Sequence, residues 1–202
     1  MPPVHSPIRE QHPRGVSLPL REVLRLAVVE SDGAASDALL RLVPPRELTR
    51  FVRSLGAEEM VVATTEAEIA GDERAQYRSW STPVAAVRWL CALQRPGALT
   101  TSSRSLLLKW MMETATGPHR IRGMLPPGTP VAHKTGTDRT RNGLTRATND
   151  IGLIALPDGR HLAVAVFIAD SRSSEADRER ALARIACAAW VHWSGSAVPG
   201  PR

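Results

Sequence analysis

The 202-residue sequence is poor in cysteine and lysine and has few aromatic residues, and these shortages exclude several classes of protein. Two cysteines, Cys91 and Cys187, are too few for a disulfide framework, and no Cys/His cluster has the spacing of a zinc site. No apolar run reaches the length of a membrane-spanning helix. The first residues also lack the apolar core and cleavage region of a signal peptide. We therefore expect a metal-free chain with no membrane span and two free thiols.

The charge balance does not predict a nucleic-acid partner, although the formal net charge is +6. Lys109 and Lys134 are the only lysines, and the many arginines are scattered and often lie beside acidic residues, as in residues 177–180. Nucleic-acid readers gather their cations on one face, and single-strand binders add stacking aromatics, which make up only 4% of this chain. With 43% hydrophobic and 23% charged residues, the composition is that of a globular protein.

The first part of the chain reads as a set of helices. Apolar residues recur at helical spacing from about 34 to 42, and Thr82-Pro83 is a typical helix start. Residues 64–81 are polar and without strong periodicity, which predicts a long functional loop. We expect a helical lobe over roughly residues 1–118.

The second part changes to strands. Residues 150–156 and 161–169 are apolar runs joined by Pro157-Asp158-Gly159, which predicts a β-hairpin. Ser173 or Ser174 is expected to cap a final helix, with these residues facing inward: Ala181, Leu182, Ile185, Ala188 and Ala189. Residues 119–202 are thus predicted to form a three-stranded antiparallel sheet with a C-terminal helix, giving a mixed α+β fold.

Three short patterns could carry chemistry. Ser31-Asp32-Gly33 separates two helices, Glu66 lies in the polar stretch, and Lys134-Thr135-Gly136 ends a strand. Alone, each has an ordinary explanation: a turn, a solvated charge and an exposed strand end. Their order along the chain, however, resembles that of penicillin-recognising serine enzymes, whose motifs are Ser-x-x-Lys, Ser-Asp-Asn and Lys-Thr-Gly.

Within that superfamily the chain resembles the class A serine β-lactamases, in particular their PER-like branch. The resemblance extends over nearly the whole chain, through residues 30–37, 65–80, 134–137, 142–143 and 147–159, and the last helix to Trp190. It implies the serine β-lactamase fold and hydrolysis of β-lactam antibiotics through an acyl-enzyme. It also implies a small-molecule β-lactam partner, no cofactor and no metal.

The resemblance assigns roles to individual residues. Ser31 would shuttle a proton to the leaving nitrogen, Lys134 would supply a positive field, and Glu66 would activate the hydrolytic water. Substrate-binding residues would be Gly33, Thr135, Gly136 and Thr137, the last donating its backbone N–H to the oxyanion. Asp32 would be a structural acid. Apart from the resemblance, His133 is expected to be a packing residue rather than a base. Any of five arginines could bind the substrate carboxylate: Arg120, Arg122, Arg139, Arg141 and Arg146.

The sequence departs from the family pattern in three ways. No Ser-x-x-Lys occurs, so we expect the sequence to be truncated at its amino terminus, before the nucleophile helix, to have an incomplete antiparallel sheet, and to be inactive as it stands. Gly33 stands where the family usually has Asn. Ala70 stands where it has Asn or His, which would affect turnover or substrate range.

Two alternatives remain open. The chain could be a non-catalytic fragment or pseudoenzyme, or a relative of penicillin-binding transpeptidases, which are acylated but turn over poorly. Glu66 favours the hydrolase. For the full-length parent the resemblance implies a periplasmic or secreted location, and we expect a monomer.

Overall fold

The computed structural model describes residues 5–195, which divide between Trp110 and Met111 into two compact units. The boundary expected from the sequence, between residues 118 and 119, lies eight residues after this division. Within the described residues, no helix combines the length and the apolarity that crossing a membrane requires.

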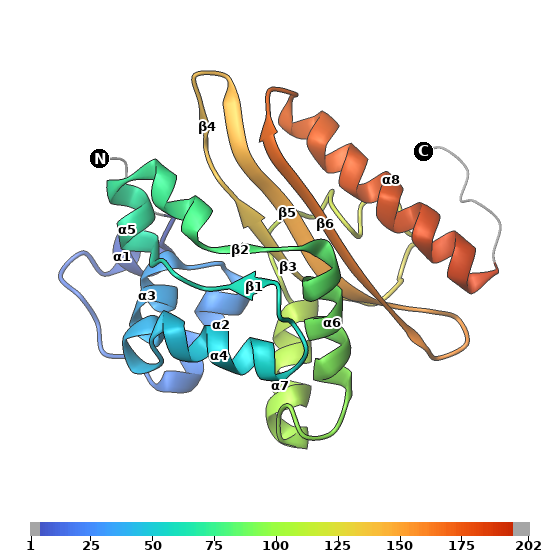
Figure 1. Cartoon of the computed structure of the whole chain (residues 1–202), viewed down its shortest axis with the longest axis horizontal. Coiled ribbons are helices and arrows are strands. Elements are labelled where there is room, and N and C mark those ends of the chain that lie inside the picture. The colour runs from blue at the N-terminus through green and yellow to red at the C-terminus, as the bar shows by residue number, and fades with distance from the viewer. Residues whose placement is uncertain (1–4, 196–202) are drawn as a thin grey trace. The chain divides into compact units, whose positions relative to one another are not determined.

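The first unit is built mainly from helices, coloured blue to green in Figure 1. Proline occupies the first turn of three of them, where a missing backbone N–H costs nothing. The elements in chain order are α1 (Pro7–Gln11), α2 (Leu20–Val29), α3 (Gly33–Leu42), α4 (Pro45–Ser54), β1 (Met60–Val61), α5 (Glu66–Gly71), the 3₁₀ helix η1 (Glu73–Arg78), β2 (Trp80–Ser81), α6 (Pro83–Gln94) and α7 (Thr101–Met112), whose end enters the second unit.

The helix at 34–42 and the Thr82 cap are confirmed, since Thr82 Oγ1 accepts a hydrogen bond from Ala85 N at 3.1 Å. The prediction of a loop over residues 64–81 is wrong, because α5 and η1 occupy most of this stretch. The missed signal is Thr65-x-x-Glu68, a capping box that starts α5.

The second unit is an antiparallel sheet with a long helix on one face. Its elements are β3 (Val131–Thr137), β4 (Thr140–Arg141), β5 (Leu144–Ala155), β6 (His161–Ser171) and α8 (Glu175–Ser194). β5 pairs with all three other strands (Figure 1), so the expected three-stranded sheet gains a short fourth strand, β4. The predicted hairpin is confirmed, with Gly159 at φ +84° in the turn between β5 and β6.

The hydrophobic core of this unit lies between the sheet and α8. Leu182, Ala186 and Trp190, one helical turn apart, pack against Ile154, Val164 and Val166. The predicted inward face was partly wrong: Leu182 is buried, but Ile185 is 52% exposed and Ala188 is also exposed. An alanine-rich helix presents several stripes of similar hydrophobicity, and Trp190 selects one of them by filling the core and donating Nε1–H to Ala155 O at 3.1 Å.

Both cysteines are free, as predicted, and both are half-buried. Burial raises the pKa of the Cys187 thiol above its usual value.

Candidate active site

Ser31 lies at a sharp junction between two helices of the first unit. α2 ends at Val29, and α3 begins at Gly33 with Asp32 as its N-cap. Ser31 itself has φ +55°, a left-handed conformation that non-glycine residues rarely adopt. The backbone is therefore held in a specific turn at this serine, as is common at functional sites.

Asp32 holds the junction in place. Its fully buried carboxylate accepts backbone hydrogen bonds from Ala35 N and Ile8 N, each at 2.8 Å, and the Ser6 hydroxyl lies 3.0 Å from both of its oxygens. A buried carboxylate needs such donors to offset the loss of water. Asp32 therefore links α1 to the start of α3. Next to it, Gly33 N donates to His5 O at 3.0 Å.

Glu66 is the first residue of α5, and its position is fixed by its neighbours in the capping box. Thr65 Oγ1 accepts from Glu68 N at 3.1 Å, and Thr65 N donates to Glu68 Oε2 at 2.8 Å. The hydrogen bond from Thr65 N and the charge of Arg78, whose Nη2 is 3.5 Å from Glu68 Oε1, hold the pKa of Glu68 below its usual value. The start of α5 is thus well defined although the helix is only one to two turns long.

Asp37, to which we gave no role from the sequence, ties Glu66 to α3. The side chain is buried, and its two oxygens accept Glu66 N at 2.7 Å and Ala67 N at 3.0 Å. A carboxylate at a helix N-terminus accepts hydrogen bonds from N–H groups that have no partner within the helix, and its negative charge interacts favourably with the positive end of the helix dipole. The signal that could have found it is an acid on the helix that starts at the Ser31 junction. α3 thus connects to both predicted groups of the first unit.

The two ends of the segment between residues 64 and 79 lie next to each other. Ser79 Oγ accepts Ala63 N at 3.1 Å and Thr64 N at 3.2 Å, and it lies 2.7 Å from Thr64 Oγ1. The two ends of the segment are therefore joined by neutral hydrogen bonds around one serine hydroxyl.

The Lys-Thr-Gly residues lie on β3 in the second unit. Because side chains alternate along a strand, His133 and Thr135 share one face, while Lys134 and Gly136 belong to the other. Thr135 is 7% exposed, and its hydroxyl lies 2.6 Å from that of Thr116. Lys134 Nζ donates to Thr135 O at 2.9 Å. An added Cβ at Gly136 would make only ordinary contacts, the nearest at 3.7 Å from Asn149 Cβ, so packing within the chain does not require glycine there.

Arg120 and Arg122, from the set of candidate arginines, donate hydrogen bonds to β3. Arg120, which is 3% exposed, donates from Nη1 to Asn149 O at 3.1 Å and Gly136 O at 3.4 Å. Its Nε is 3.1 Å from the Glu179 carboxylate of α8. Arg122 donates to Val131 O at 3.2 Å, at the far end of the strand. Of these two, only Arg120 reaches the Lys-Thr-Gly segment.

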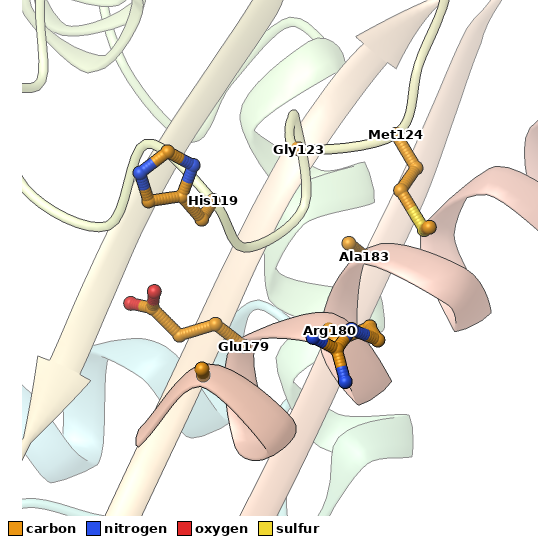
Figure 2. Close-up of a pocket in the computed structure, with 7 residues that line it drawn as sticks. His119, Gly123, Met124, Glu179, Arg180 and Ala183 are labelled. Carbon is orange, nitrogen blue, oxygen red and sulfur yellow. The ribbon is translucent and has the colours of Figure 1, made fainter. Parts of the chain in front are cut away.

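A hollow of about 260 Å³ lies in the second unit, between the 119–124 segment and α8 (Figure 2). Its lining includes Glu179, the partner of Arg120, but none of the residues predicted from the sequence. The full lining is His119, Gly123, Met124, Ala176, Glu179, Arg180 and Ala183. Within residues 5–195, no group of three or more His, Cys, Asp or Glu side chains could hold a metal ion.

Comparison with solved structures defines the class of protein. A β-lactamase from Chitinophaga pinensis is 43% identical, with a TM-score of 0.91 over 96% of this chain and 72% of its own. A class A β-lactamase from Bacteroides cellulosilyticus is 30% identical, with a TM-score of 0.90 over 97% of this chain and 72% of its own. The fold is therefore that of the class A β-lactamases, as the resemblance implied.

The chain belongs to the β-lactamase enzyme family, whose sequence profile matches residues 3–193. The extended-spectrum β-lactamase PER-1 of Pseudomonas aeruginosa is 43% identical over 86% of this chain, which confirms the likeness to the PER-like branch. The chain spans 57% of the length of PER-1.

Proposed function

We propose that the protein is a serine hydrolase that opens β-lactam antibiotics through an acyl-enzyme, in the manner of an antibiotic-resistance enzyme. The observation that carries the proposal is the organisation of α3, which begins at the Ser31 junction and holds the backbone of Glu66 through Asp37. A proton-transfer hydroxyl and a carboxylate base are thereby connected to one rigid element, as acid–base catalysis requires.

The proposed reaction has two steps. A serine attacks the lactam carbonyl, the C–N bond of the ring breaks, and the proton that the attacking hydroxyl gives up reaches the leaving nitrogen through the hydroxyl of Ser31. In the second step, Glu66 takes a proton from water, the water oxygen attacks the acyl ester, and the acyl C–O bond breaks while that proton passes to the serine oxygen, which restores the serine and Glu66. No Ser-x-x-Lys occurs in the 202 residues, so the nucleophile of this scheme is not among them. We therefore expect no turnover from these residues alone.

Substrate binding is proposed to use the exposed end of β3. The ammonium of Lys134 would attract the substrate carboxylate and keep the Ser31 proton mobile, and the backbone N–H of Thr137 would stabilise the oxyanion. The Thr135 hydroxyl, which lies beside that of Thr116, would also contact the substrate. Gly136 would let the substrate approach the backbone. Among the candidate arginines we choose Arg120 as the second cation, since it already contacts the carbonyl of Gly136.

Two substitutions relative to the family pattern bear on turnover and range. Gly33 offers no side-chain amide to the substrate, and Ala70, on α5, offers no polar group to hold the hydrolytic water. Slow deacylation would be the result. We further propose a monomer in a periplasmic or secreted location, as the resemblance to class A enzymes implied.

A chimera tests the proposal. The PER-1 segment that precedes its matched region is joined to this chain, and nitrocefin hydrolysis is measured alongside acylation by mass spectrometry. We expect turnover in the chimera and, with Glu66→Gln, an acyl-enzyme that accumulates. Glu58→Gln, an exposed acid before β1, is the matched control and should behave like the parent. Acylation without turnover in the parent chimera would support a penicillin-binding relative instead, and no acylation at all would support a pseudoenzyme.

A further inference from the structure

We infer that His133 and Asp150 are positioning residues for the substrate-binding strand: a buried hydrogen-bonded pair that fixes β3 and the Arg120 segment relative to each other. The inference rests on the proposed function, because it takes the Lys134–Thr137 end of β3 to be the part that binds substrate.

The pair is completely enclosed. His133 and Asp150 both have 0% exposure, and His133 Nδ1 lies 3.0 Å from Oδ1 and 2.9 Å from Oδ2 of the carboxylate. A carboxylate only accepts, so Nδ1–H donates. His133 Nε2 has no hydrogen-bond partner within the described residues. Burying an imidazole in this way is costly, and a merely space-filling role is served better by an apolar side chain.

Asp150 connects three segments of the second unit. It belongs to β5, it accepts the hydrogen bond from β3, and its Oδ2 accepts Ile121 N at 3.2 Å. Ile121 follows Arg120, whose guanidinium contacts the carbonyls of Gly136 and Asn149. One carboxylate therefore sets the position of both the lysine strand and the arginine segment.

The backbone around His133 is built to receive its ring. His133 lies opposite Gly152 in the β3–β5 register, and a Cβ on Gly152 would come within 2.8 Å of His133 Cβ and 2.7 Å of Ala132 O. The carbonyl of His133 also accepts the Thr114 hydroxyl at 2.8 Å. Because neighbouring side chains alternate, holding His133 on one face of β3 fixes the direction in which Lys134 leaves the other face.

Variants at His133 separate positioning from packing. His133→Asn keeps an N–H near the place of Nδ1, whereas His133→Leu keeps the volume and loses the donor; Asp150→Asn removes the charge. The matched control is Asp158→Asn, an exposed acid of the β5–β6 turn that is paired with Arg160. Each variant of the full chain is titrated with benzylpenicillin by NMR. No Ser-x-x-Lys is present, so the proposed acylation cannot consume the probe.

We expect His133→Leu and Asp150→Asn to raise the benzylpenicillin Kd about tenfold or more, ~1.4 kcal/mol, and to shift the amide signals of residues 134–137 without ligand. His133→Asn should restore the Kd to within roughly threefold of the parent, and Asp158→Asn should change nothing. If the pair only stabilises the fold, His133→Leu and Asp150→Asn will lower the melting temperature and leave the Kd of the folded fraction unchanged. That result would overturn the inference.

Failure of the proposed function looks different. If the parent chain binds no benzylpenicillin, the proposed substrate is wrong. The positioning role of His133 and Asp150 is then tested by the amide signals without ligand. Signals of residues 134–137 that are the same in the parent and in His133→Leu then refute it. Should Asp150→Asn not fold, the comparison of His133→Leu with His133→Asn decides.

Discussion

Asp37→Asn tests how firmly α3 holds Glu66. The carboxylate of Asp37 accepts two backbone hydrogen bonds, from Glu66 N and Ala67 N, and it is buried. The amide of asparagine keeps one accepting oxygen and presents an NH₂ group to the other N–H. Hydrogen bonds to charged groups contribute about 1.5–3 kcal/mol each, so at least this much of the local stability of α5 should be lost. A helix of six residues has little stability of its own to replace it.

Hydrogen exchange of individual amides measures the effect. At tenfold per 1.4 kcal/mol, the protection factors of the Glu66 and Ala67 amides should fall roughly 10- to 150-fold in Asp37→Asn. Asp72→Asn, which removes the charge of an exposed carboxylate that accepts Arg74 N at the start of η1, serves as control and should leave these two amides unchanged. Equal protection in the parent and in Asp37→Asn would show that α5 does not depend on α3.

Three further predictions concern glycine and pH. Gly117→Ala should lower the free energy of unfolding by about 1–3 kcal/mol in a denaturant titration, because φ is +61° and the new Cβ would lie 2.6 Å from Thr135 Cγ2. Gly136→Ala should change that free energy by less than about 1 kcal/mol, since its nearest contact is at 3.7 Å, yet weaken benzylpenicillin binding measured by NMR. The pKa of Glu68 is lowered in the folded chain, so its carboxylate stabilises α5 above the usual glutamate pKa. This contribution disappears as the pH falls through the lowered value, and amide exchange of α5 should show no such pH dependence in Glu68→Gln.

Local signals predicted much of the fold. Helix starts such as Thr82-Pro83 and the turn at Pro157-Asp158-Gly159 depend on a few neighbouring residues, and both are confirmed. The prediction of a loop over residues 64–81 was wrong because the structure there depends in part on a residue far away in the sequence. Its capping box at Thr65 is a local signal, but the helix it starts is held in part by Asp37, which is distant in sequence. Periodicity alone could not reveal that support.

Two features could not be predicted because they depend on tertiary contacts: which face of α8 is buried, and the hydrogen bond between His133 and Asp150. Leu182 and Ile185 are both apolar, and only the shape of the core under the helix decides that Leu182 is inside. His133 was expected to be a packing residue; its ring is buried as that implies, but the bond to Asp150 depends on strand register. Motifs indicated Ser31, Glu66 and Lys134 as candidates, whereas the contacts that Asp32, Asp37 and His133 make were visible only in the structure.

The central place of β5 limits how this part of the gene can change in length. β5 pairs along most of its length with β6 and over seven positions with β3, so deleting one codon between residues 144 and 149 would turn every following side chain of the strand to the opposite face of the sheet. Asp150 and Ile154 would then leave the side on which α8 packs. Insertions and deletions in homologous genes should therefore gather in the turn at residues 156–160 and avoid the strand itself.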